Sequence, residues 1–162
     1  MGNTTGGKKM GSVVSWLPQA LVIAAALVVV GFIVSILSLR VTERYFSAAL
    51  AASTLYAGEH PGETAVTYEG ETHPLDAQTA DRLYGYLTQP AYLRPGVAGE
   101  GERSVTVSFG GGSSLYARDG GAKLVYVEFT AQNGREFKAT LQYPVVNAGW
   151  KGLMNCLGLP TE

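Results

Sequence analysis

An uninterrupted apolar run near the N-terminus constrains this chain more than any other feature. No charged residue occurs from Met10 to Leu39, and the core of the run, Leu17 to Leu39, is 23 residues long. As an α-helix this core spans roughly 34 Å, enough to cross the ~30 Å hydrocarbon core of a bilayer. A cleaved secretory signal has a shorter apolar core, of about 7–15 residues. We therefore predict that residues 16–39 form a transmembrane helix that remains as an uncleaved anchor.

The charges on either side of the run predict its orientation. Lys8 and Lys9 precede it without any acid in a short tail, residues 1–15, whereas Arg40 and Arg44 follow it with a glutamate between them. Positive charge favours the cytoplasmic side of a membrane. We expect a single-pass protein of the cell membrane, with the lipid bilayer as a partner, the N-terminus in the cytoplasm and the C-terminal domain outside it.

The segment Lys8–Lys9–Met10–Gly11, followed by an apolar helix, resembles the leader of type IV prepilins. In that family a peptidase cuts after the glycine and the helix becomes the packed core of a filament, so the resemblance implies a pilin-like filament subunit that begins at Ser12. The chain departs from the family at Trp16, where the family usually has glutamate. Cleavage after the small residues of Ala49–Leu50–Ala51 is a further alternative, although this triplet lies ten residues beyond the apolar core.

A second helical pattern follows the apolar run. Gly58 is expected to cap this helix at its C-terminus and Pro61 to stop it. We assign residues 40–58 to a juxtamembrane helix that can continue the transmembrane helix, and we expect it to pack on the chain's own domain, the alternative being an exposed stalk. The residues of its apolar stripe, which recur at helical spacing, are Val41, Tyr45, Ala48, Ala49, Ala52 and Leu55.

The remaining residues, 59–162, are assigned to an extracytoplasmic α+β domain. A short strand over 65–68 and a turn at Glu69–Gly70 are predicted first, and then a helix capped by Asp76. The proline- and glycine-rich segment 88–102 is expected to be a loop. The apolar stripe of the predicted helix consists of Ala80, Leu83, Tyr84 and Leu87.

The last third of the chain alternates as an antiparallel β-meander does. Val105, Val107 and Phe109 alternate with serine and threonine, which predicts one buried and one solvated face. In the following hairpin, a three-residue loop ending at Gly134 keeps one face apolar by pairing Phe129 with Phe137, Val127 with Ala139 and Val125 with Leu141. A terminal helix presents the stripe Trp150, Leu153, Met154 and Leu157, and we expect the helices to cover one face of the sheet.

Composition excludes several classes of function. From Tyr45 onward there are 8 Lys and Arg against 12 Asp and Glu, a net charge of −4, which argues against a nucleic-acid partner. The single cysteine, Cys156, allows no internal disulfide and is interpreted as a small buried apolar residue of the last helix, the alternative being a redox or intermolecular disulfide role outside the cell.

No motif with a specific chemistry is found. His60 and His73 lie near glutamates but before prolines, and they are interpreted as turn residues rather than metal ligands. The glycines before Ser113 and Ser114 join two strands with no following lysine, unlike a phosphate-binding loop, and no GxSxG surrounds either serine. We therefore expect no enzyme, no cofactor and no metal site, and keep an extracytoplasmic enzyme as the last alternative.

Two groups of residues are candidates for binding. Tyr86, Tyr92 and Leu93 are predicted to form a partner surface beside the proline-rich loop, the alternative being that Tyr92 and Leu93 fold back over the sheet. Within the membrane, small residues four apart allow close helix contact, namely Ala20, Ala24, Gly31 and Ser35. The sequence thus predicts a membrane-anchored binding or assembly protein of the cell envelope, with another envelope protein or a second copy as its partner.

Overall fold

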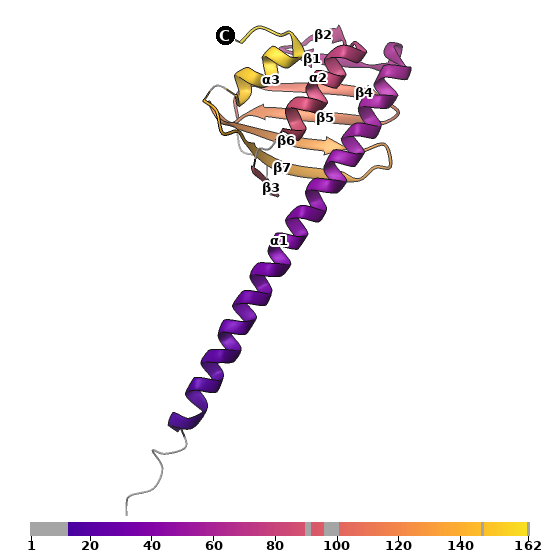
Figure 1. Ribbon diagram of the computed structural model, residues 1–162. Coiled ribbons are helices and arrows are strands. Elements are labelled where there is room, and N and C mark those ends of the chain that lie inside the picture. Colours follow the sequence, from indigo (N-terminus) through magenta and orange to yellow (C-terminus); the bar gives the residue numbers. More distant parts are fainter. Residues whose placement is uncertain (1–12, 90–91, 96–100, 147, 162) are drawn as a thin grey trace, which may run out of the picture. The chain divides into compact units, whose positions relative to one another are not determined.

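The computed structural model describes residues 13–89, 92–95, 101–146 and 148–161. Helix α1 (Val13–Glu59) is continuous through the apolar run and the juxtamembrane segment. The chain divides into two compact units, residues 1–38 and residues 39–162 (Figure 1). The second unit holds the α+β domain.

A seven-stranded antiparallel sheet forms the centre of this domain, in the order β2-β1-β4-β5-β6-β7-β3. The β-meander predicted from the alternating pattern is confirmed as β4 to β7, and β1 and β3 extend it by pairing with β4 and β7. The strands are β1 (Ala65–Tyr68), β2 (Glu71–Pro74), β3 (Tyr92–Pro95), β4 (Ser104–Gly110), β5 (Ser113–Asp119), β6 (Leu124–Thr130) and β7 (Glu136–Gln142).

Two shorter helices and the C-terminal part of α1 lie on the same face of the sheet (Figure 1). Helix α2 (Ala77–Thr88) begins as predicted, because the carboxylate of Asp76 accepts a hydrogen bond of 2.7 Å from the backbone N–H of Thr79. Helix α3 (Trp150–Leu157) ends at Gly158, which adopts the left-handed conformation. A single 3₁₀ turn, Pro61–Glu63, joins α1 to β1.

The β6–β7 hairpin has the predicted register, with Phe129 opposite Phe137. Its turn is closed by a bond from the N–H of Gly134 to the carbonyl oxygen of Ala131, at 2.8 Å, and Gly134 has φ +77°. Side chains other than glycine, asparagine and aspartate rarely adopt that conformation, so the glycine sets the length of the loop.

Apolar side chains from the sheet and the helices meet in one core. The ring of Phe46 on α1 contacts Phe129 and Phe137 edge-on, at centroid distances of 5.7 and 6.1 Å. Phe109 contacts Phe129 in the same manner at 6.3 Å. Edge-to-face pairs of this kind add to the stabilisation that burial alone provides. The aromatic cluster therefore fastens α1 to the middle of the sheet.

The side of α1 that packs on the sheet differs from the prediction. Phe46, Leu50 and Ala57 are buried, together with Ser53 and Thr54. Five of the six residues of the predicted stripe instead face away from the core, with Val41 50%, Tyr45 52% and Leu55 67% exposed and both Ala48 and Ala52 exposed. The sixth, Ala49, is half-buried and packs against the core. The packed side is hard to recognise in the sequence because it includes the polar residues Ser53 and Thr54. Their hydroxyls are buried and form hydrogen bonds within the fold.

Two strands and one helix end also differ from the prediction. Strand β2 completes a hairpin after the Glu69–Gly70 turn, and β3 lies inside the segment that we predicted to be a loop. Helix α1 runs through Gly58 to Glu59, so Gly58 is a helical residue rather than the cap. The backbone N–H of His60 still bonds to the carbonyl oxygen of Tyr56, at 3.0 Å.

Candidate interaction sites

The apolar part of α1 is the first candidate, as a site for lipid. Among the described residues, one helix is long and apolar enough to span a membrane, with a mean hydropathy of 3.0 in its most apolar window and none of that window buried. Large side chains such as Leu21, Val28 and Phe32 are 67–72% exposed. Apolar side chains exposed in this way are compatible with a membrane anchor, because a bilayer would surround them with hydrocarbon.

The four small residues proposed for helix–helix contact lie in this part of α1. Ala24, Gly31 and Ser35 are exposed and Ala20 is half-buried. The Ser35 hydroxyl donates to the carbonyl oxygen of Gly31 at 2.9 Å, so it is satisfied within its own helix. A Cβ added at Gly31 would meet no atom within 4 Å, so packing inside the chain does not require glycine there. The contact itself stays a prediction.

Tyr86 is not available as a surface residue, and this part of the prediction is wrong. Its side chain is 8% exposed, and its hydroxyl donates to the carbonyl oxygens of Ala148 and Gly149, both at 2.7 Å. Its ring stacks on Tyr143 with centroids 4.6 Å apart. Burial raises the pKa of both phenols. Tyr86 therefore ties α2 to the segment before α3.

Leu93 and Tyr92 belong to strand β3, at one edge of the sheet. Leu93 is half-buried, packs against the core and pairs with Leu141 of β7. The backbone of Tyr92 pairs with Gln142. The side chain of Tyr92 lies outside the described residues, so its predicted role in binding is untested. Tyr92 and Leu93 therefore belong to an edge strand of the sheet rather than to a loop.

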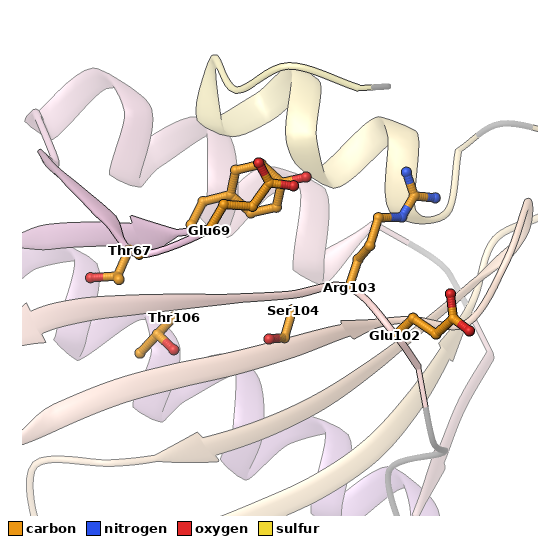
Figure 2. A pocket seen from close by; sticks show the side chains of 8 residues that line it. Thr67, Glu69, Glu102, Arg103, Ser104 and Thr106 are labelled. Atoms are coloured by element: carbon orange, nitrogen blue, oxygen red, sulfur yellow. The ribbon is translucent and has the colours of Figure 1, made fainter.

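A shallow depression of about 320 Å³ is the second candidate site. Strand β1 ends at Tyr68, opposite Val105 of β4. Residues 102–104, which precede Val105, extend beyond the end of β1 and line the depression. Figure 2 shows its side chains coming from the end of β1, the following turn and the start of β4. The lining residues are Thr67, Tyr68, Glu69, Gly70, Glu102, Arg103, Ser104 and Thr106.

The guanidinium of Arg103 is already engaged beside this depression. It donates to one carboxylate oxygen of Asp119 through two nitrogens, at 2.6 and 3.1 Å, and lies 5.9 Å from the centre of the Trp150 ring. Burial raises the pKa of the Tyr68 phenol, and a hydrogen bond to Glu69 raises it further. With the guanidinium paired, the depression offers hydroxyls and the two carboxylates of Glu69 and Glu102.

These groups suit hydrogen bonding to a small polar or cationic molecule. The lining residues include no histidine, cysteine or lysine, and their ionisable groups are the carboxylates of Glu69 and Glu102, the Tyr68 phenol and the Arg103 guanidinium. The sequence did not reveal this site, because the site depends on the β1–β2 hairpin. The sequence predicted the first strand and the turn of that hairpin but not its second strand. The alternation of Ser104 and Thr106 in β4 was the available signal.

Ser113, considered as a nucleophile, is structural. It is 1% exposed, its hydroxyl lies 2.6 Å from that of Ser53, and it donates to the carbonyl oxygen of Thr130 at 3.1 Å. Ser114 lies next to it in β5, opposite Ser108 of β4. Both serines lie in the strand that follows the glycine turn, as predicted.

The histidines and the cysteine also have local roles. His60 stacks on Tyr56 at 4.0 Å, and His73 lies in the edge strand β2 with Glu71 at 3.6 Å. Within the described part of the chain, no three His, Cys, Asp or Glu side chains gather closely enough to hold a metal ion. Cys156 is half-buried and free, and burial raises the pKa of its thiol.

Comparison of the chain with protein-family models, with curated proteins and with solved structures finds no match.

Proposed function

We propose that this chain is a single-pass membrane protein whose α+β domain acts outside the cytoplasm by binding, as a part of a cell-envelope assembly and without catalysis. The observation that carries the proposal is the exposed apolar segment of α1 joined to a folded domain. The burial of Ser113 supports binding rather than catalysis by this serine, because its hydroxyl is enclosed in the core beside Ser53 and Thr130.

The location can be tested by labelling single cysteines. In a Cys156→Ser background, Lys151→Cys places a thiol at an exposed position of α3, and Asn3→Cys places one before the apolar run. We expect a membrane-impermeant maleimide to label Lys151→Cys in intact cells or protoplasts, and Asn3→Cys only after the membrane is permeabilised. The opposite pattern would mean that the orientation is inverted, and protection of both thiols would refute an extracytoplasmic domain.

A pilin-like subunit is the second candidate, and one observation favours it. Helix α1 runs without a break from the apolar segment into the core, where Phe46 and Leu50 pack on the sheet. The resemblance of Lys8–Lys9–Met10–Gly11 to a prepilin leader implies such a helix. The N-terminal residue of the mature protein separates the two candidates. Ser12 supports the filament subunit, whereas Met1 or Gly2 supports the anchor.

A further inference from the structure

The outward side of α1 in the folded domain carries an apolar stripe that the core does not use. Of the five large apolar side chains exposed among the described residues of 39–162, three lie on this side, namely Val41, Tyr45 and Leu55. Ala48 and Ala52 lie between them and are also exposed. We call these five residues the outer stripe. An apolar surface of this kind on a folded domain indicates an interaction site.

The spacing of the outer stripe is that of a coiled coil. Its members follow one another at intervals of four, three, four and three residues. At about 100° per residue they stay within about 40° of one line along the helix, whereas the buried Phe46, Leu50 and Ala57 lie about 140–180° away from it. A 3–4 repeat of apolar residues is the pattern by which two helices wrap around each other. One side of α1 is therefore committed to the sheet, and the opposite side is shaped for a second helix.

We propose that a second copy of this chain covers the outer stripe, as a parallel two-stranded coiled coil. This inference rests on the proposed membrane anchoring. Chains anchored through the same segment share their orientation and their depth, so each copy presents the same five side chains at the same height. Confinement to one membrane also raises the effective concentration of each copy for the other.

The charges beside the outer stripe are compatible with such a self-pair. No member of the stripe is charged, but the guanidinium of Arg135 lies 4.7 Å from the centre of the Tyr45 ring and has to shift for a second helix to pack there. Arg44 flanks the stripe. In a parallel coiled coil, a residue at this position faces the residue five positions later on the other helix, which here is the neutral Ala49. Two copies of Arg44 are thus not brought together. The next position of the repeat is Glu59, where α1 ends, so like charges would meet only at its last residue.

The same phase continues backward in the sequence through the apolar run. Counting by sevens from Ala52 and Tyr45 reaches Ser38, Gly31 and Ala24, which are all small residues. Small residues allow helices to approach closely in a membrane. Gly31 in particular has open space around the position of a Cβ within its own chain. Of the small residues predicted for helix contact, Ser35 falls outside this phase.

The size of the stripe limits how the dimer forms. A stable interface between soluble proteins buries about 800 Å² on each partner, more than five side chains on four turns of helix provide. The outer stripe alone is therefore too small to hold two free domains together. Association requires the anchored chain, with the apolar run adding its own contacts.

Disulfide trapping in membranes tests the proposal with the full chain. In a Cys156→Ser background, Ala48→Cys and Ala52→Cys place a thiol on the outer stripe. Arg40→Cys, about 100° round the same helix, and Lys151→Cys on α3 are the matched controls. Under mild oxidation we expect a covalent homodimer at Ala48→Cys and Ala52→Cys at least several-fold more abundant than at either control. Equal yields at all four positions would overturn the proposal, as would a stripe adduct with the mass of a different protein.

A charge variant provides the second readout. Ala52→Arg places two like charges across the seam, so we expect it to reduce the trapping of Ala48→Cys about ten-fold. Lys151→Glu, away from the stripe, should leave that trapping unchanged. An unchanged yield with Ala52→Arg would contradict the seam. Labelling of Lys151→Cys from outside keeps the two hypotheses apart: a labelled domain without stripe trapping refutes the dimer alone, and stripe trapping in an unlabelled domain refutes the location alone.

Discussion

The hydroxyl oxygens of Ser53 on α1 and Ser113 on β5 lie 2.6 Å apart inside the core. Both residues are fully buried, at 0% and 1% exposure. Each hydroxyl has one proton, so one serine donates to the other, and the second donates to its backbone carbonyl oxygen, that of Ala49 for Ser53 at 3.0 Å or that of Thr130 for Ser113 at 3.1 Å. This polar contact favours one rotation of α1 on an otherwise apolar surface, because a helix turned about its axis would lose the serine–serine hydrogen bond.

The first prediction concerns this pair. Ser53→Ala or Ser113→Ala alone should lower the free energy of unfolding by about 0.5–1.5 kcal/mol, because each removes the serine–serine hydrogen bond while the remaining hydroxyl keeps its backbone carbonyl. The double variant should cost less than the sum of the two, since the shared hydrogen bond is lost only once. Urea denaturation of the four proteins measures the coupling. Strict additivity would mean that the two serines act independently.

The second prediction concerns which part of the chain folds alone. A fragment of residues 39–162 should unfold cooperatively, whereas one of residues 58–162 should not. The shorter fragment lacks the buried Phe46 and Leu50 and uncovers Phe129. Each such side chain contributes about 1.5–3 kcal/mol by burial, a large share of a domain stability of about 5–15 kcal/mol. Trp150 is the only tryptophan in either fragment, so its fluorescence reports the transition. Equal midpoints would show that α1 is dispensable.

The third prediction concerns Trp150 at the start of α3, which is 3% exposed. Trp150→Ala should cost about 3–5 kcal/mol through the cavity that it leaves. Trp150→Phe should cost much less, because the indole N–H has no hydrogen-bond partner among the described residues and its removal leaves no acceptor unpaired. Thermal unfolding followed by far-ultraviolet circular dichroism tests both variants. If Phe were as costly as Ala, a partner for the N–H would have to exist.

The fourth prediction is a loss of stability in alkali. Burial raises the pKa of Tyr86 and Tyr143 above the value of 10.0 that a free phenol has. Above pH 10 the unfolded chain loses these protons and the folded chain keeps them, so the contribution of the two phenols to the free energy of unfolding should be constant well below pH 10 and fall as the pH rises further. The slope is at most about 1.4 kcal/mol per pH unit for each phenol.

Tyr143→Phe provides the control for that prediction. It removes one titrating group and preserves most of the stacking on Tyr86, so the decline above pH 10 should be shallower than in the unaltered protein. Urea midpoints between about pH 8 and 11 give the slopes. Parallel declines in the two proteins would assign the alkaline effect to other groups.

The fold could be predicted from the sequence most accurately where apolar residues recur at the spacing of a strand with one buried face. The register of β6 and β7 follows from the requirement that Phe129 and Phe137 share one face with a glycine in the turn, and it is confirmed. Strand β2 could not be found in this way. All four of its residues are exposed, so neither face of the strand is marked by apolar side chains. Strand β3 lies among prolines and pairs with a strand far along the chain.

The candidate sites were harder to predict than the fold. On α1 the more apolar side is the exposed one, while Ser53 and Thr54 lie against the domain. Hydropathy therefore assigned the two sides in reverse. Tyr86 was expected at the surface because it falls off the stripe of α2, but the carbonyl groups before α3 provide its hydroxyl with partners that only the tertiary structure brings near. The depression beside Arg103 depends on where β1 stops, which no local pattern indicates.

The packing of Phe46 against Phe129 and Phe137 has a consequence for how the protein is made. The ribosome synthesises α1 before β6 and β7. Until those strands have emerged, the side of α1 that carries Phe46 has no sheet to pack against. Pairings between distant parts of a chain form late and slowly. The meander can assemble from neighbouring strands as it emerges, and the helix must then be captured by it. The order of synthesis therefore makes α1 the first helix to form and one of the last elements to pack into the core.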